Sequence, residues 1–182
     1  MLGIIRSTIL AVTLFELTVG SASRGTEATQ VGAPAEFRGL DGVPHRLAEL
    51  NGRPAVVNFW ATWCMPCKEE MPRLQSLSEQ YQPKGVRFVA ISIDDAETKA
   101  KIAGLIAKRH FGVTVWTGAT EASLKELQLG NILPATLILD ESGVPIGKIE
   151  GEVRTKDISS RLNWLLNGRQ GKQPKLLQKN DW

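Results

Sequence analysis

The chain has two cysteines, Cys64 and Cys67, and two residues separate them in the segment WATWCMPC, residues 60–67. Positions three apart along a helix lie on one face, so the two sulfurs can approach closely enough to form a disulfide. The pair follows an apolar, β-rich run and precedes a segment with helical spacing of apolar residues. This pattern predicts a redox-active cysteine pair at a strand-to-helix junction.

The place of each cysteine in the helix predicts its role. A helix N-terminus offers unpaired N–H groups and a partial positive charge, which favour a thiolate over a thiol. We therefore expect Cys64, at the helix start, to be the exposed attacking sulfur, with a pKa below the ordinary value of about 8.5. Cys67 lies one turn further and should be shielded, so that it resolves the mixed disulfide and releases the reduced partner.

Two other interpretations of the pair are weaker. A structural zinc site needs about four ligands, and His45 and His110 stand at no metal-ligand spacing from the cysteines. We therefore expect no metal site and place both histidines on the surface. A purely structural disulfide would close a loop so short that it removes little entropy from the unfolded chain.

The elements that must position the pair can be outlined from apolar periodicity. Strands and helices alternate along the chain, which predicts an α/β fold whose central sheet has a parallel portion. A hairpin then adds an antiparallel edge, and two short extended pieces flank an Asp41-Gly42 turn before all of these. The predicted strands are 37–40, 43–47, 55–60, 86–93, 113–116, 135–140 and 144–150, and the predicted helices are 47–51, 65–80, 96–109, 121–129 and 155–166.

Length and composition fit one ordinary globular domain. The chain has 182 residues, of which 42% are hydrophobic and 23% are charged, and its formal net charge is +3. The positive excess lies in residues 167–182, so the body of the chain is neutral. A neutral body gives no indication of nucleic-acid binding, and we expect none.

The two ends differ from the body. Residues 1–23 combine Arg6, an apolar stretch interrupted by Glu16, and small residues at 20–23, which predicts a signal peptide or a retained membrane anchor. Residues 24–30 are polar and are interpreted as a linker. Residues 167–182 are basic, lose the apolar periodicity, and are predicted to be a disordered tail.

With these motifs in place, residues 31–166 resemble the thioredoxin superfamily, and within it the TlpA/ResA-like extracytoplasmic branch. The motifs that carry the resemblance are GAPAEF at 32–37, VVNFWATWCMPCKEEMPRL at 56–74, VAIS at 89–92 and LPAT at 133–136. The resemblance implies a thioredoxin-like fold, in which helices flank a central mixed sheet that carries an N-terminal β-hairpin extension.

The resemblance also implies roles for single residues. Pro134 matches the family's cis proline, which faces the two sulfurs. Glu70 matches the acid that the ResA-like branch uses near its thiols, and we expect it to handle the proton of Cys67. The alternative is an exposed helix acid that merely suits the helix dipole, and Glu69 is the less favoured substitute. Asn58 stands where cytosolic thioredoxins carry a buried aspartate, which argues against a general cytosolic thioredoxin.

The resemblance also implies a second group of residues, which contact the substrate. The active-site surface should include two tryptophans, of which Trp60 is more readily interpreted as a packing residue. The substrate-binding residues that we expect are Trp63, Met65, Pro66, Leu133 and Pro134.

The function that the resemblance implies is that of an exported thiol–disulfide oxidoreductase, acting mainly as a reductant of client proteins. Its clients would be apocytochrome c cysteines before haem attachment or copper-site cysteines in oxidase assembly. We expect a periplasmic or other extracytoplasmic monomer, secreted or anchored at its N-terminus, with a membrane thiol protein as electron donor and no cofactor.

Two other functions stay open at this stage. A Cu(I) chaperone would hold the metal between Cys64 and Cys67. A thiol peroxidase would need a threonine three residues before the first cysteine, where Ala61 stands, and Thr62 is one position too late.

Overall fold

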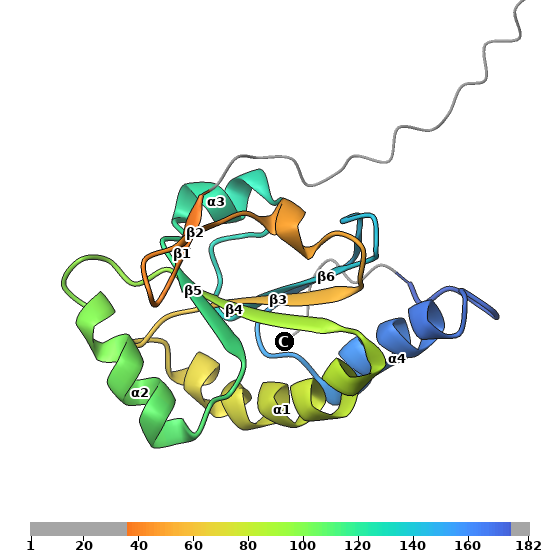
Figure 1. Cartoon of the computed structure of the whole chain (residues 1–182), viewed down its shortest axis with the longest axis horizontal. Coiled ribbons are helices and arrows are strands. Elements are labelled where there is room, and N and C mark those ends of the chain that lie inside the picture. Colours follow the sequence, from red (N-terminus) through yellow and green to blue (C-terminus); the bar gives the residue numbers. More distant parts are fainter. Residues whose placement is uncertain (1–35, 176–182) are drawn as a thin grey trace, which may run out of the picture.

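The computed structural model describes residues 36–175, so the predicted signal peptide or anchor, the linker and the end of the tail lie outside the described residues. A seven-stranded sheet runs through the centre in the order β2-β1-β5-β4-β3-β6-β7 (Figure 1). The strands are β1 (Phe37–Gly39), β2 (Pro44–His45), β3 (Ala55–Trp60), β4 (Arg87–Ser92), β5 (Thr114–Thr117), β6 (Ala135–Leu139) and β7 (Pro145–Glu150).

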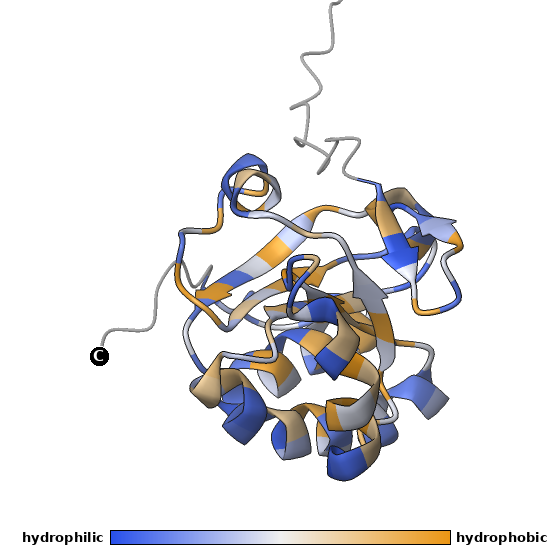
Figure 2. Cartoon of the chain, turned by 90° about the vertical axis from the view of Figure 1, so that its left-hand side faces the viewer, coloured by the Kyte–Doolittle hydropathy of each residue, from blue (hydrophilic) through white to orange (hydrophobic). Residues whose placement is uncertain are grey.

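Helices cover both faces of this sheet. On one face lie α1, α2 and α4, and on the other lie η1 and α3 (Figure 1). The outward sides of the helices are hydrophilic, whereas the sheet and the inward sides are hydrophobic (Figure 2). The helical segments are η1 (Leu47–Leu50), α1 (Met65–Tyr81), η2 (Gln82–Lys84), η3 (Lys99–Lys101), α2 (Ile102–Arg109), α3 (Glu121–Glu126) and α4 (Thr155–Leu166).

The sheet is mixed, as the sequence predicts. β3 pairs in parallel with β4, and β4 with β5, while β6 and β7 add an antiparallel edge. At the opposite edge β1 and β2 form the N-terminal hairpin, with Gly42 in its turn at a φ of 84°. A positive φ is readily adopted by glycine because it has no Cβ. The thioredoxin-like fold with an N-terminal β-hairpin extension is therefore confirmed.

Strand β3 is buried along its whole length because both of its faces meet helices. Val56 and Trp60 point into the cluster under α1, whereas Val57 and Phe59 point into the cluster under α3. A strand buried on both sides requires a continuous apolar run rather than an alternating one. This explains why residues 55–60 contain only one polar side chain, that of Asn58.

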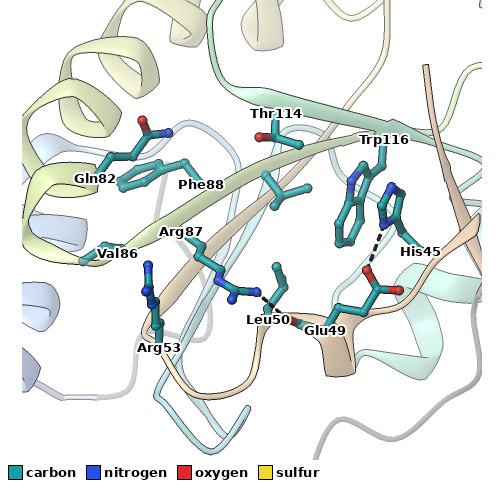
Figure 3. A pocket seen from close by; sticks show the side chains of 11 residues that line it. His45, Glu49, Leu50, Arg53, Gln82, Val86, Arg87, Phe88, Thr114 and Trp116 are labelled. Atoms are coloured by element: carbon teal, nitrogen blue, oxygen red, sulfur yellow. Dashed lines mark hydrogen bonds and ion pairs between the residues drawn. The ribbon is translucent and has the colours of Figure 1, made fainter. Parts of the chain in front are cut away.

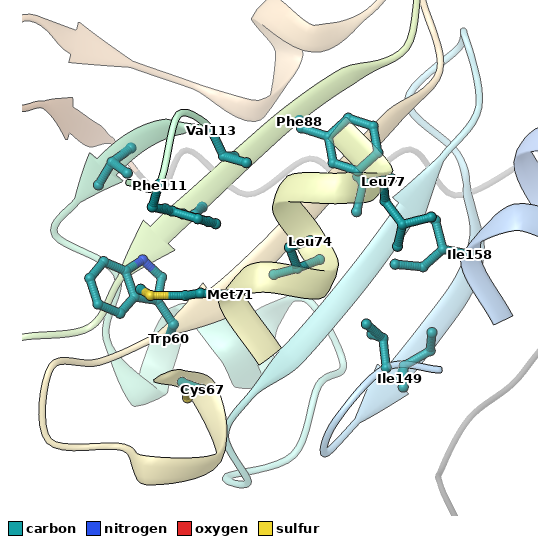
Figure 4. Packing of buried hydrophobic residues seen from close by; sticks show 14 of the residues in the cluster. Trp60, Cys67, Met71, Leu74, Leu77, Phe88, Phe111, Val113, Ile149 and Ile158 are labelled. Carbon is teal, nitrogen blue, oxygen red and sulfur yellow. The ribbon is translucent and has the colours of Figure 1, made fainter. Parts of the chain in front are cut away.

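The predicted apolar face of α1 is confirmed. Met71, Leu74 and Leu77 are each 2% exposed and pack with Trp60 between the helix and the sheet (Figure 4). Burying each such side chain contributes about 1.5–3 kcal/mol. This packing fixes α1 against β3, and thereby fixes the start of the helix relative to the strand that precedes it.

Two predicted helices are shorter than expected. The helix predicted from residue 96 begins only at Ile102, after the short η3 segment. The carboxylate of Asp95 accepts hydrogen bonds from the backbone N–H groups of Glu97 and Thr98, which holds this stretch in a turn. Helix α3 ends at Glu126, because Gln128 adopts a left-handed φ of 56°.

The described part of the predicted tail, residues 167–175, contacts the body of the protein. Arg169 donates hydrogen bonds to Asp140 at 2.9 Å and to Glu141 at 2.7 Å, and its guanidinium lies 5.7 Å from the centre of the Trp164 ring. Because Arg169 is partly exposed, each pair contributes about 0–1 kcal/mol. The disorder predicted from residue 167 therefore does not apply at Arg169, because an acidic turn and an aromatic ring hold its side chain.

Candidate active site

The two cysteines are joined by a disulfide, with their Cα atoms 5.3 Å apart. Strand β3 ends at Trp60, and a short loop leads to Cys64, which is the N-cap residue of α1. The sulfur of Cys64 accepts a hydrogen bond from the backbone N–H of Cys67 at 3.2 Å. The cysteine pair therefore occupies the strand-to-helix junction that its spacing predicts, with one sulfur against the free N–H groups of the helix.

Neither cysteine is exposed in the disulfide form. Cys64 is 6% exposed and Cys67 is 2% exposed, so the order of the two agrees with their predicted roles. The predicted exposure of Cys64 is wrong for this state, because its side chain is bonded to Cys67 and belongs to the hydrophobic cluster under α1. The exposed residues beside the two cysteines, Trp63 and Met65, are called the rim of the site.

Two large apolar side chains form that rim. Trp63 is 59% exposed and Met65 is 57% exposed, and they flank Cys64 in the sequence. Pro66 is half-buried, and Trp60 is buried as the packing residue that we predict. Large exposed apolar groups beside a reactive sulfur are typical of a surface that binds another chain.

Pro134 and the cysteine loop lie at the same end of the neighbouring strands β3 and β6. β6 begins at Ala135, which pairs with Phe59 near the end of β3, so the residue before β6 lies next to the start of the cysteine loop. The Leu133–Pro134 peptide bond is cis, which confirms the predicted conformation. Pro134 is buried and Leu133 is half-buried. Their contact with a client stays a prediction.

Glu70 is completely buried, so the interpretation as an exposed helix acid is wrong. Its Oε1 accepts a hydrogen bond from the side-chain amide of Asn58 at 2.9 Å, and its Oε2 accepts one from the backbone N–H of Val153 at 2.9 Å. Burial raises the pKa of Glu70 from 4.5 to about 8, although both hydrogen bonds and the charge of Arg73 act in the opposite direction. At neutral pH this carboxyl group is therefore mostly protonated.

Helix geometry places the carboxyl group of Glu70 on the same face of α1 as Cys67. Glu70 follows Cys67 by three residues, and both are buried on the sheet side of the helix. Glu69, the substitute considered for this role, is exposed on the other side. The same amide of Asn58 that binds Glu70 also donates to the hydroxyl of Thr136 at 3.0 Å, which fixes its orientation.

One residue that sequence reasoning missed holds the cysteine loop. Asp94 is buried, and its carboxylate accepts hydrogen bonds from the backbone N–H of Thr62 at 2.9 Å and from the Thr62 hydroxyl at 2.5 Å. The hydroxyl of Ser92 donates to the same carboxylate at 2.7 Å. Because β3 and β4 are parallel and Trp60 pairs with Ser92, residues just after both strands meet. The sequence signal that could have revealed Asp94 is an acidic residue directly after the second buried strand, predicted at residues 86–93.

Both histidines lie apart from the cysteines. His45 stacks on Trp116 and makes a hydrogen bond with Glu49 at 2.8 Å, and His110 is exposed where α2 ends. Among residues 36–175, no group of three or more His, Cys, Asp or Glu side chains is arranged to hold a metal ion. Over the same residues, no helix combines the length and apolarity needed to cross a bilayer.

Comparison with known proteins adds the family. The model of the Redoxin family matches residues 25–163. The chain belongs to the Redoxin family. It is 32% identical over 118 residues to the thiol-disulfide oxidoreductase ResA of a Bacillus cereus strain, a match that covers 65% of this chain and 66% of that protein.

A second relative agrees with this placement, and a solved structure agrees with the fold. ResA of Geobacillus thermodenitrificans is 32% identical over 125 residues, which are 68% of this chain and 69% of that protein. The crystal structure of an uncharacterized conserved protein from Geobacillus kaustophilus superposes with a TM-score of 0.67 at 22% identity, over 82% of this chain and 86% of that one. The chain is thus a ResA-like member of the thioredoxin-fold thiol–disulfide oxidoreductases, and the two cysteines of its CxxC motif form a disulfide.

Proposed function

We propose that the protein reduces disulfides of client proteins outside the cytoplasm, through a dithiol–disulfide cycle of Cys64 and Cys67. One observation carries this proposal: the disulfide lies at the N-terminus of α1, with the buried carboxyl group of Glu70 one turn below it. A helix N-terminus favours the thiolate that attacks, and a buried acid with a raised pKa can exchange a proton with the thiol that resolves.

The cycle begins from the reduced pair. The Cys64 thiolate attacks one sulfur of the client disulfide, forms a mixed disulfide, and releases the other client sulfur as a thiolate that takes up a proton. Cys67 then loses its proton and attacks the Cys64 sulfur, which closes the intramolecular disulfide and releases the second client thiolate. The second client thiolate also takes up a proton. The client thereby gains two electrons and two protons, and the protein loses two electrons and two protons, counting the proton that Cys64 released when its thiolate formed. A thiol donor must therefore reduce the pair again.

Glu70 is suited to accept the proton of Cys67. Its pKa of about 8 is close to the ordinary thiol value of about 8.5, so the transfer between the two groups is nearly balanced in free energy. At pH 7 about one tenth of the carboxyl groups are ionised and able to act as the base. The resolving step should therefore become faster as the pH rises toward 8.

The exposed rim supports an extended, partly apolar client segment. Trp63 and Met65 offer apolar surface beside the pair. The backbone of Leu133, just before β6, is available to pair with such a segment, whereas Pro134 has no N–H and its carbonyl accepts the N–H of Gly151 at 2.7 Å. The resemblance favours apocytochrome c or copper-site cysteines as clients and a membrane thiol protein as donor. We further propose a monomer that acts in the periplasm or another extracytoplasmic space, after export directed by residues 1–23.

Trapping of clients tests the central proposal. In the full chain with Cys67→Ser, the mixed disulfide cannot be resolved, so client proteins should stay attached to Cys64 until a reductant is added. The matched control, Cys64→Ser, should trap none. Equal trapping by the two variants would reject the assigned roles. Tight Cu(I) binding without disulfide exchange would replace the proposal by the chaperone alternative.

The proton role and the compartment need separate measurements. Single-turnover release of the client from the mixed disulfide should be slowed by at least about tenfold in Glu70→Gln and unchanged in Glu69→Gln. Equal rates in both variants would leave water as the only proton acceptor. A fusion of residues 1–30 to a reporter that is active only outside the cytoplasm should be active, and an inactive, cytosolic fusion would contradict export.

The thiol peroxidase alternative receives no support from the site. The hydroxyl of Thr62 donates to the buried carboxylate of Asp94 and is thereby directed away from a substrate on Cys64. Peroxide turnover at a rate comparable with disulfide exchange would reverse this conclusion.

A further inference from the structure

A hollow of about 410 Å³ lies at the end of the sheet opposite to the disulfide (Figure 3). It results from the stagger of the strands. β3 and β4 pair from Ala55 and Arg87 onward, whereas β5 joins β4 only from Val89, opposite Thr114. Arg87 and Phe88 therefore have no partner on β5, and a notch remains between β4, η1 and the start of β5.

This hollow is separate from the redox pair. Its strand residues come from the amino-terminal half of β4, while Cys64 follows the carboxyl end of the parallel strand β3. The six residues of β3 span about 20 Å at roughly 3.3 Å per residue. A ligand in the hollow would not contact the sulfurs, so its binding is independent of the proposed function.

The inner surface of the hollow is apolar and rigid. Leu50, Phe88 and Val89 are buried side chains of the two hydrophobic clusters and line it. Trp116 forms one wall, and its indole ring stacks with His45, with ring centres 4.7 Å apart, and with Phe37, at 6.2 Å. Because Trp116 is only 4% exposed, a ligand can touch little of the indole.

Two guanidinium groups lie at this apolar surface (Figure 3). Arg87 donates one of its N–H groups to the backbone carbonyl of Glu49 and keeps other donors free for a ligand. Within residues 36–175, Arg53 forms neither an ion pair nor a side-chain hydrogen bond. Arg53 is exposed and Arg87 is half-buried, so the two guanidinium groups give the mouth of the hollow a positive charge and unused donors, which attract an anion.

The carboxylate in the same wall does not supply that anion. Glu49 binds the ring nitrogen of His45 at 2.8 Å with one oxygen and accepts the backbone N–H of Arg46 at 2.9 Å with the other. These bonds lower the pKa of Glu49 and direct both oxygens away from the two guanidinium groups. The remaining polar groups of the lining, the amide of Gln82 and the hydroxyl of Thr114, are neutral.

We propose that this hollow binds a small amphipathic anion: an apolar ring or short chain that carries one carboxylate, sulfonate or phosphate group. The apolar part would rest against Leu50 and Val89, which lie on the η1 face of the sheet, and the acidic group would lie between Arg53 and Arg87. The volume is within the usual range of about 300–1,000 Å³ for small-molecule sites. A charge-assisted hydrogen bond from the half-buried Arg87 contributes more than an ion pair between fully exposed groups.

Two fluorescent probes test the proposal with the full chain. The anion 8-anilinonaphthalene-1-sulfonate carries the required acid, and the neutral N-phenyl-1-naphthylamine lacks it. We expect the wild type to bind the anion more tightly than the neutral probe. In Arg53→Gln the dissociation constant of the anion should rise about tenfold, and that of the neutral probe should not change. Arg109→Gln, at an exposed position where α2 ends, is the matched control and should bind like the wild type.

A second variant shows whether the probe occupies the hollow. Thr114 is exposed at the rim, and a strand position accepts tryptophan, so Thr114→Trp should fill the hollow without unfolding the chain and should abolish binding of the anion. Unchanged binding in Thr114→Trp would overturn the proposal, as would equal affinities of Arg53→Gln and Arg109→Gln. Disulfide exchange should be the same in all these variants, which keeps this test independent of the redox assignment.

Discussion

The buried carboxyl group of Glu70 should make the stability of this protein depend strongly on pH, and Glu70→Gln should remove that dependence. In the unfolded chain the group titrates at its ordinary pKa of 4.5, whereas in the folded protein burial raises the pKa to about 8. A raised pKa in the folded state means that the favourable contribution is complete below 4.5 and is lost as the pH rises through about 8.

The magnitude follows from the same two values. Between pH 4.5 and about 8, each pH unit should lower the free energy of unfolding by about 1.4 kcal/mol, and the total should be on the order of 5 kcal/mol. Glutamine has no charge to bury, but its NH₂ group must face either the N–H of Val153 or Asn58, whose amide would then have to flip and reverse its hydrogen bond with Thr136. Either arrangement disturbs the present hydrogen-bond network, which costs up to about 1–3 kcal/mol at every pH.

The curves of unfolding free energy against pH for the wild type and for Glu70→Gln should therefore cross. Glu70→Gln should be less stable than the wild type below about pH 5 and more stable above about pH 8. Urea unfolding of the oxidised protein from about pH 4 to 9 measures this, and Glu69→Gln is the matched control because Glu69 is an exposed neighbour on the same helix. Parallel curves for the wild type and Glu70→Gln would refute the reasoning, since they would mean that Glu70 titrates alike in both states.

Two further predictions concern the cysteine loop. In single-cysteine variants, iodoacetamide should label Cys64 at lower pH than Cys67, because Cys64 lies nearer the helix N-terminus, and equal pH profiles would contradict this. Asp94→Asn should lower the free energy of unfolding by about 1–3 kcal/mol and slow client reduction, because an amide nitrogen cannot accept the hydrogen bonds of Thr62. Glu97→Gln, at an exposed position three residues further, should leave both quantities close to the wild type, and a similar effect in both variants would show that Asp94 does not specifically hold the loop.

The elements and the redox pair could be predicted because their signals are local. The run at residues 55–60 and the spacing of Met71, Leu74 and Leu77 specify one strand and one helix face within a few positions, and both appear as predicted. The cysteines are three positions apart in a helix start, so their approach depends on helix geometry alone. The last helix, at residues 155–166, also has its predicted limits.

The environment of Glu70 could not be derived in this way. From the residues alone this acid was equally compatible with an exposed position, and its burial depends on Asn58, 12 residues before it, and on Val153, 83 residues after it. The link between Asp94 and Thr62 spans 32 residues and likewise depends on the pairing of β3 with β4. The pKa of Glu70 and the contact of Asp94 with the cysteine loop both depend on groups that are distant in the sequence. The packing of the sheet and helices decides which of these groups exclude water and which donate hydrogen bonds.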